Sequence, residues 1–287
     1  MQRDILQILE QDIGRLTKSQ KKVAAYIIKD PIEAAFSTVE QIANQVQTST
    51  TTIVRLTLFL GFSGYSEFQR ELQELLKNRT GPSTRLEINF RERDKKNDII
   101  KGIATQEIEN LTKTFDSLSD DLILRANEAL RSARQIYIIG FRSCFSVAHF
   151  LSYNLTRIFG NCAQLWESGG GICEQMNYMT DQDVLIAITM PRYIRDVVRV
   201  AQIAKEKSAT VIAITDGPLS PLAECADILL AVECKTTGFH NSVTSAMLIA
   251  ELLIGVSTTE NPELVKTNLH NSEAILRRMN VHHNSSY

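Results

Sequence analysis

The sequence predicts an α/β protein in two parts: an all-helical N-terminal domain, and a C-terminal α/β domain with a five-stranded parallel sheet covered by helices on both faces. Residues 1–78 show helical patterns of apolar side chains throughout. Residues 79–98 are polar and highly charged, which is typical of a linker. Within residues 99–287, short apolar runs alternate with helical patterns after Arg134, as in parallel sheets. These three segments are the expected domain boundaries.

Composition and charge restrict the classes of protein that fit the chain. Its 287 residues are 44% hydrophobic and 22% charged, as in ordinary soluble proteins of two domains. The formal net charge of -2 means that any nucleic-acid contact must come from a local patch. The five cysteines show no metal-binding spacing, and no apolar run reaches the roughly 20 residues that span a bilayer. Charges near the N-terminus do not fit a signal peptide, so we expect a cytoplasmic protein with no metal, cofactor or membrane contact.

The N-terminal segment contains a series of short helical patterns. The stretch SQKKVAAYIIKD has its apolar residues on one helical face and ends before Pro31. In STVEQIANQV, Ser37 and Glu40 have the spacing of a capping box at the start of the next helix. TSTTTIVRLTLFLGF follows after a short turn, with Ser49 at its N-cap and Gly61 at its end. YSEFQRELQELLKNR completes the domain as an amphipathic helix.

Two of these helices, separated by a tight turn, have the proportions of a helix-turn-helix. The second helix begins with a hydroxyl-rich block that packing does not explain, because serine and threonine are poor interior helix formers. Hydroxyls at a helix N-terminus, with an arginine nearby, can contact phosphates and base edges of DNA. The candidate DNA-binding residues are Ser49, Thr50, Thr51, Thr52 and Arg55. The alternative is a capped surface helix with no partner.

The second half of the chain shows the alternation expected of a parallel sheet. Residues 99–118 and 119–132 predict two helices that precede the first strand. The expected strands are 135–140, 162–166, 183–189, 209–215 and 227–232. The expected helices between and after them are 144–159, 170–179, 194–207 and 242–257. In such a sheet, ligands bind beyond the carboxyl ends of the strands, near the point where the strand order reverses.

The segment FSTVEQIANQVQTSTTTIVRLTLFLGFSGYSEFQREL resembles the N-terminal DNA-binding domain of the RpiR-type (MurR/RpiR) bacterial transcription regulators. The second half of the chain resembles the SIS (sugar isomerase) domain that these regulators carry after the helix-turn-helix. The resemblance covers nearly the whole chain and keeps the order of its parts. It implies a homodimer or homotetramer that binds double-stranded operator DNA and responds to a sugar phosphate or a related metabolite.

Two turns depart from the pattern that the SIS resemblance implies. After the first strand the family shows G-x-G-x-S, whereas here Arg142 replaces the second glycine and Cys144 replaces the serine. After the third strand the family shows S-x-S-G-x-T, whereas here only Thr189 keeps an aliphatic hydroxyl and Arg192 replaces the glycine. The candidate ligand-binding residues are Gly140, Arg142, Ser143, Cys144, Thr189, Arg192, Tyr193 and, ahead of the last expected helix, His240.

The two arginines indicate an anion site made by side chains. A guanidinium group offers a planar pair of donors that fits carboxylate or phosphate oxygens. Arg142 and Arg192, on nearby strand ends, are expected to converge on one anionic metabolite, either a sugar phosphate or a sugar acid. Two alternatives stay open: the arginines pair with carboxylates such as Asp196 or Glu174, or they face a subunit interface.

The favoured function is a ligand-responsive transcription regulator of carbohydrate or related metabolism, not an enzyme. Isomerisation needs a general acid and a general base at the reacting carbons of the sugar. The turns offer only His240 and Glu174 as candidates for such a pair. A helix-turn-helix would also be superfluous to a phosphosugar isomerase, which is the alternative function.

Overall fold

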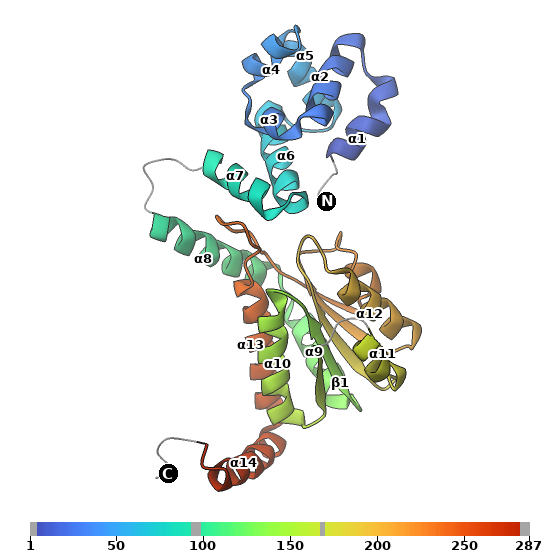
Figure 1. Cartoon of the computed structure of the whole chain (residues 1–287), viewed down its shortest axis with the longest axis vertical. Coiled ribbons are helices and arrows are strands. Elements are labelled where there is room, and N and C mark those ends of the chain that lie inside the picture. Colours follow the sequence, from blue (N-terminus) through green and yellow to red (C-terminus); the bar gives the residue numbers. More distant parts are fainter. Residues whose placement is uncertain (1–4, 93–98, 167–169, 282–287) are drawn as a thin grey trace. The chain divides into compact units, whose positions relative to one another are not determined.

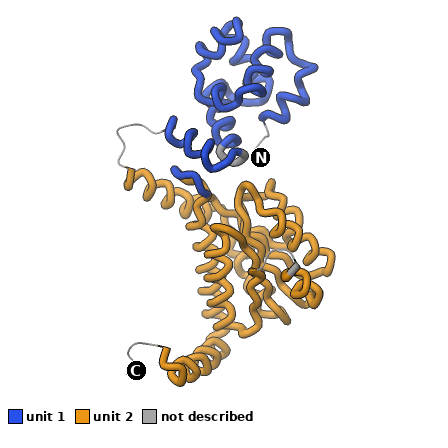
Figure 2. The backbone as a smooth tube through the Cα atoms, viewed as in Figure 1, with its two compact units in different colours: residues 1–98, 237–240 blue, residues 99–236, 241–287 orange. Residues whose placement is uncertain are grey.

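The computed structural model describes residues 5–92, 99–166 and 170–281. The chain separates into two compact units, which are residues 1–98 with 237–240 and residues 99–236 with 241–287 (Figure 2). Each unit buries its own set of apolar side chains, so each has a hydrophobic core that can stabilise it independently.

The first unit is helical in its described part, as the sequence predicts (Figure 1). Besides a short 3₁₀ turn, its helices are α1 (Ile5–Asp12), α2 (Lys18–Lys29), α3 (Pro31–Phe36), α4 (Val39–Gln45), α5 (Thr50–Phe59), α6 (Tyr65–Arg79) and α7 (Pro82–Glu92). Their apolar faces meet in one core, in which Ile42, Ile53, Phe68 and Leu72 are almost fully buried. Helices this short depend on such packing for their stability.

The start of α4 differs by one residue from the capping box expected at Ser37 and Glu40. Thr38 is the N-cap: its hydroxyl accepts the Gln41 N–H at 3.2 Å, and the Gln41 side chain accepts the Thr38 N–H at 2.7 Å. Ser37 instead donates its hydroxyl to the Glu33 carbonyl at 2.8 Å and closes α3. The expectation was wrong because both pairs have the same spacing, which the sequence pattern alone does not separate.

Helices α4 and α5 form the pair that the sequence predicts. In the turn between them, Gln47 lies in the left-handed region at φ 52°. Ser49 is the N-cap of α5, where its hydroxyl accepts the Thr52 N–H at 3.2 Å. Gly61 follows the other end of the helix at φ 86°, a conformation that glycine adopts without steric cost. Both expected ends of the second helix are therefore present.

The segment expected to be a linker, residues 79–98, contains the helix α7. Ile88 of this helix is fully buried in the core of the first unit. Asn89 donates from its side-chain amide to the Gly238 carbonyl at 2.5 Å. The polar composition of the segment conceals the helix, because few of its residues are apolar and only those contribute to a recognisable stripe. The first unit therefore extends beyond residue 78.

The second unit contains a five-stranded parallel sheet in the order β2-β1-β3-β4-β5. Its strands are β1 (Ile136–Gly140), β2 (Cys162–Leu165), β3 (Val184–Ile188), β4 (Thr210–Thr215) and β5 (Ile228–Ala231), all inside the expected ranges. Its helices are α8 (Ile99–Ser117), α9 (Asp120–Ser132), α10 (Cys144–Phe159), α11 (Gly170–Asn177), α12 (Arg195–Glu206), α13 (Thr244–Glu260) and α14 (Pro262–Arg278). The sequence analysis did not predict α14.

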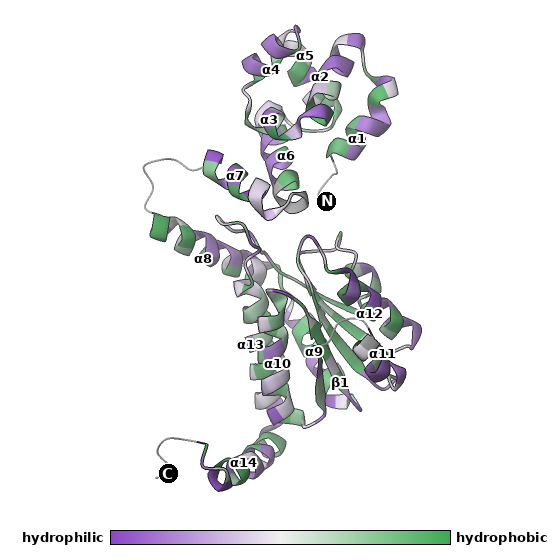
Figure 3. Cartoon of the chain, viewed as in Figure 1, coloured by the Kyte–Doolittle hydropathy of each residue, from purple (hydrophilic) through white to green (hydrophobic). Residues whose placement is uncertain are grey.

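Helices cover both faces of the sheet, as expected (Figure 1). Successive side chains of a strand point to opposite faces. Ile138 and Ile186 pack on one face with α9, α10 and α13, whereas Ile139 and Ala187 pack on the other with α11 and α12. Every residue of β1 and β3 is buried, which explains why these strands are continuous apolar runs (Figure 3).

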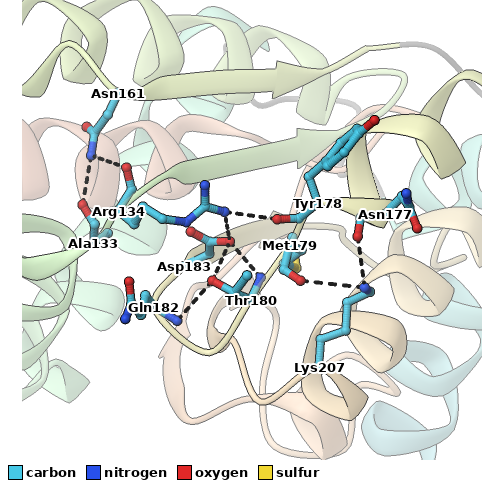
Figure 4. Close-up of polar contacts among 10 residues, drawn as sticks. All are labelled: Ala133, Arg134, Asn161, Asn177, Tyr178, Met179, Thr180, Gln182, Asp183 and Lys207. Atoms are coloured by element: carbon cyan, nitrogen blue, oxygen red, sulfur yellow. Dashed lines mark hydrogen bonds and ion pairs between the residues drawn. The ribbon is translucent and has the colours of Figure 1, made fainter.

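A buried carboxylate ties together the starts of β1 and β3 (Figure 4). Asp183, just before β3, has a fully buried side chain and accepts from the Arg134 guanidinium at 2.6 Å. The same oxygen accepts the Thr180 N–H at 2.7 Å, and Arg134 also donates to the Tyr178 carbonyl at 2.9 Å. Asn161, just before β2, donates to the Arg134 carbonyl at 3.1 Å. This cluster fixes the edge of the sheet opposite to the carboxyl ends of the strands.

Replacing Asp183 by Asn removes the charge that Arg134 pairs with and leaves a buried amide. We expect Asp183→Asn to lower the free energy of unfolding by ~1–3 kcal/mol, measured by urea denaturation. Asp181→Asn is the matched control, because Asp181 is an exposed residue of the same turn and its loss should change stability by less than ~0.5 kcal/mol. Equal losses in the two variants would contradict the structural role of the buried carboxylate.

Candidate functional site

The exposed side of α5 carries residues predicted to contact DNA. Thr51 and Arg55 are exposed and lie four residues apart, hence on the same side of the helix. The hydroxyls of Ser49 and Thr52 lie 2.9 Å apart in the N-terminal cap, and Thr50 and Thr52 are half-buried. Within the described chain, the Arg55 guanidinium has no ion-pair partner. The exposed surface of the helix therefore carries one unpaired cation and exposed hydroxyl groups.

The carboxyl ends of the strands form the second candidate site. In the order β2-β1-β3-β4-β5, the direction of the connections reverses between β1 and β3, where open parallel sheets bind ligands. Gly140 at the end of β1 is paired in register with Ile188 at the end of β3. The two turns that carry most of the predicted ligand-binding residues therefore start from neighbouring positions.

The turn after β1 is set by a close approach between Gly140 and the start of α10. A Cβ atom on Gly140 would lie 2.7 Å from the Cys144 carbonyl oxygen and 3.1 Å from the Ala148 Cβ, so only glycine fits. Arg142 follows at φ 56°, and both Arg142 and Ser143 are exposed. Cys144 is buried, and burial raises the pKa of its thiol to about 11, so the thiol is neutral near pH 7.

The turn after β3 lies between Thr189 and Ile194 and carries Arg192. The Thr189 hydroxyl accepts the Ile194 N–H at 3.1 Å, so this hydroxyl closes the turn. From the segment before α13, the Asn241 side-chain amide donates to the Pro191 carbonyl at 2.9 Å. Arg192 is exposed, with φ 68°. Hydrogen bonds at Pro191 and Ile194 thus hold the turn in place on both sides of Arg192.

A hydroxyl–carboxylate contact links the turns after β3 and β4. Tyr193 donates to the Asp216 carboxylate at 3.1 Å. Burial raises the pKa of Asp216, and the hydrogen bonds to its carboxylate oppose that rise. Burial, followed by the nearby Asp216 charge, also raises the pKa of Tyr193. Ser220 accepts from the Thr215 hydroxyl at 2.9 Å and from the Leu222 N–H at 3.2 Å, so it shapes the turn.

Arg142 and Arg192 share an uncommon backbone conformation. Positive φ costs a non-glycine residue about 1–2 kcal/mol. Both arginines stand where the SIS-like pattern has glycine, so they keep a glycine conformation and add a guanidinium group. Within the described chain neither guanidinium forms an ion pair, with Asp196, Glu174 or any other carboxylate. Strain at such positions is typical of functional sites.

His240 groups with the first unit instead of with these turns, because it belongs to the short segment 237–240. Its ring packs edge-on against Phe239 at a centroid distance of 5.5 Å. A ligand contact by His240 stays a prediction. Asn241 and Asp216, whose side chains hydrogen-bond to residues of the turn after β3, are not among the residues predicted from the sequence, because asparagine and aspartate are common in turns and carry no distinguishing signal.

In residues 5–92, 99–166 and 170–281, no cluster of three or more His, Cys, Asp or Glu side chains is arranged to hold a metal ion. None of the described helices combines the length and hydropathy that spanning a bilayer requires. A surface groove of about 430 Å³ lies between α13 and α14, lined by Thr258, Pro262, Val265, Lys266, Leu269, His270 and Glu273. It includes none of the residues predicted from the sequence.

Two family models match the chain. The model of the rpiR-family helix-turn-helix domain matches residues 3–79, and the model of the SIS domain matches residues 129–255. An uncharacterized HTH-type transcriptional regulator of Caldanaerobacter subterraneus is 25% identical over 283 residues, which are 96% of this chain and 99% of that protein. The HTH-type transcriptional regulator HexR of Escherichia coli is 27% identical over 241 residues, which are 80% of this chain and 78% of HexR.

The same two-part architecture occurs in a solved structure, that of the Vibrio vulnificus NanR protein complexed with ManNAc-6P. It aligns with a TM-score of 0.61 at 21% identity, covering 98% of this chain and 100% of the NanR chain, which shows a shared fold. The chain belongs to the RpiR family of transcription regulators, with a helix-turn-helix domain followed by a SIS domain.

Asp216 should make the stability of the protein depend on pH. Its pKa is raised from the ordinary 3.8 in the folded state, mainly by burial, so the folded state loses stability as the pH rises from about 4 through the raised value. Asp216→Asn keeps an acceptor for the Tyr193 hydroxyl and carries no charge. Urea denaturation should show the variant gaining stability relative to the wild type between about pH 4 and pH 7. A difference that stays constant over this range would contradict the raised pKa.

Proposed function

We propose that this regulator senses a small anionic metabolite, a sugar phosphate or a sugar-acid-like compound, at the turns after β1 and β3. The pair Arg142 and Arg192 carries the proposal. Both have exposed guanidinium groups without an ion-pair partner in the described chain, both have positive φ, and their turns follow neighbouring strands. Glycine would adopt this backbone conformation without strain, so the presence of arginine at both positions is explained if a ligand binds the two guanidinium groups.

The available side chains favour recognition by arginine over recognition by small hydroxyl groups. Thr189 uses its hydroxyl within the turn, and Cys144 is buried. Arg142 and Arg192 supply planar donor pairs that fit phosphate or carboxylate oxygens. Ser143 is exposed beside Arg142 and adds a hydroxyl for the rest of the ligand. NanR, which shares the fold, was solved with ManNAc-6P, and this supports sugar phosphates as the first compounds to test.

On the DNA side, we infer that α5 enters the major groove of an operator. The match of residues 3–79 to the rpiR-family helix-turn-helix model supports this helix as the recognition element. Arg55 and the hydroxyl groups at the helix N-terminus would contact base edges and phosphates. In a homodimer or homotetramer, two copies of α5 would match half-sites about one helical turn apart.

Residues of the segment 233–242 contact both the Arg192 turn of the proposed ligand site and helix α8. Three hydrogen bonds join the segment to α8. The Glu233 N–H donates to the Thr114 hydroxyl at 2.9 Å, and the Asn110 amide donates to the Lys235 carbonyl at 2.7 Å. The Ser242 hydroxyl donates to the Glu107 carboxylate at 2.6 Å. Asn241, in the same segment, binds the Pro191 carbonyl beside Arg192. A ligand that moves the Arg192 turn would therefore also move α8, and would shift the balance between two states of the regulator.

Arg142→Gly and Arg192→Gly separate the ligand role of these residues from their structural role. Glycine accepts positive φ, so each variant should keep a stability within ~1 kcal/mol of the wild type. A thermal-shift screen of sugar phosphates and sugar acids with the wild type identifies the compound to use. Each variant should bind it at least about tenfold more weakly by calorimetry, because a hydrogen bond from a charged group contributes ~1.5–3 kcal/mol.

Ser208→Gly is the matched control for these variants. Ser208 also has positive φ, at 61°, but it lies between α12 and β4, at the opposite ends of the strands. This variant should bind the compound as the wild type does. Undiminished affinity in both arginine variants would reject the proposed site. Conversion of a sugar phosphate by the wild-type protein would support the isomerase alternative instead.

Arg55→Ala tests α5 as the helix that contacts DNA. The probe is a duplex selected from a random pool with the wild-type protein. The variant should bind it about ten- to a hundredfold more weakly, because losing an arginine–base contact removes ~1–3 kcal/mol, and its circular dichroism should be unchanged. Arg70→Ala, which removes an exposed arginine from α6, is the control. Equal binding by all three proteins would reject the assignment of this helix.

A further inference from the structure

Helix α8 faces its own unit with polar side chains. Asn110 and Thr114 are 1% and 0% exposed, and both hydrogen-bond to the segment that follows β5. Glu107 is half-buried and accepts the Ser242 hydroxyl at 2.6 Å. A helix on the surface of a globular unit normally buries its apolar face. In α8, the buried face is polar.

A second face of α8, next to the polar one, is apolar and largely exposed. Ile100 is 79% exposed, Ile108 is 63% exposed and Phe115 is 59% exposed. With two neighbours they form the α8 stripe, whose members recur every three or four residues: Ile100, Ala104, Ile108, Leu111 and Phe115. At 1.5 Å per residue the stripe is about 22 Å long. A continuous apolar surface of this kind is typical of a protein–protein interface.

We propose that the α8 stripe is the surface through which two copies of this chain associate, with the two α8 helices packed antiparallel about a twofold axis beside Ile108. The inference deepens the proposed function and rests on it, because binding to two half-sites requires two copies of α5. The occupant of the stripe is a second copy of the same helix.

The members of the stripe complement one another in the antiparallel direction. An axis beside Ile108 sets Ile100 opposite the partner's Phe115. It also sets Ala104 opposite the partner's Leu111, so a small side chain meets a large one, as interdigitating helices require. The two copies of Ile108 then meet at the centre. One helix face is therefore sufficient to form a closed, self-complementary interface.

Charges along one edge of the stripe select the same arrangement. Lys101 follows Ile100 near the N-terminal end, and Asp116 follows Phe115 near the C-terminal end. Antiparallel packing brings Lys101 near the partner's Asp116 on both sides of the axis, and it also sets the helix dipoles in opposite directions. Parallel packing would set like charges against each other. The charge pattern thus fits a second copy in the antiparallel orientation.

The position of the stripe connects association with ligand binding. The polar face of α8 hydrogen-bonds to Glu233, Lys235 and Ser242, and Asn241, next to Ser242, contacts the Arg192 turn. The adjacent face of the same helix packs against the second copy. A ligand that moves the turn therefore acts on the helix that sets the arrangement of the two chains.

The first test replaces Ile108 by Glu in the full-length protein. Because Ile108 is 63% exposed in the single chain, the variant should keep the circular dichroism spectrum of the wild type. At the axis it would bury two carboxylates against each other. Sedimentation equilibrium should show the dissociation constant of the dimer raised at least about a hundredfold. Leu219→Glu, at a residue that is 61% exposed in the turn after β4, is the matched control and should leave association unchanged.

The second test exchanges the charges at the edge of the stripe. Lys101→Glu and Asp116→Lys should each weaken association and make the remaining affinity less sensitive to salt. The double variant should regain wild-type association, because each copy again faces an opposite charge. A double variant as weak as the single variants would overturn the antiparallel arrangement.

Three further results would overturn the proposal. They are a wild-type protein that sediments as a monomer, an Ile108→Glu variant that dimerises as tightly as the wild type, and an Ile108→Glu variant with reduced thermal stability but unchanged molecular mass. The last result would mean that the stripe is covered within one chain. None of them bears on the ligand site, which Arg192→Gly tests by affinity, so the two proposals fail separately.

Discussion

The parallel register between β1 and β3 is the constraint on which the proposed ligand site depends. Gly140 pairs with Ile188, so the chain leaves both strands at the same level and the two arginine-bearing turns begin side by side. At the other end of the same strands, Arg134 and the buried Asp183 hold the starts of β1 and β3 together. A slip of one residue would move every side chain of one strand to the opposite face of the sheet, disrupt its packing against the helices and offset the two turns.

Each turn combines backbone strain with contacts that hold it in place. Arg142 and Arg192 keep a left-handed conformation, and their neighbours maintain it: Gly140 packs against α10, and Asn241 binds the Pro191 carbonyl. A preformed turn loses less conformational entropy when a ligand binds than a mobile one. The same contacts connect each arginine to other elements, so a ligand that moves one guanidinium also acts on its neighbours.

The proposed function requires that ligand binding at the SIS domain affects DNA binding, and α8 combines two surfaces within its own unit that would serve this. Its polar face binds the segment that reaches the Arg192 turn, and its apolar stripe is exposed. A rigid helix with two such faces couples the proposed ligand site to the exposed apolar surface. A rigid shift of α8 that accommodates a ligand on one side necessarily changes the surface on the other.

The sequence by itself determined what depends on local pattern. Every strand end lies within one residue of its expected position, because each strand is a short, mostly apolar run. Tertiary structure decided what depends on distant contacts: the burial of Ile88 in α7, the positive φ of Arg142 and Arg192, and the polar inward face of α8, whose hydrogen bonds join residues 119 to 135 positions apart. Periodicity shows which face of a helix is apolar, but only the packing of the whole chain decides which face is covered.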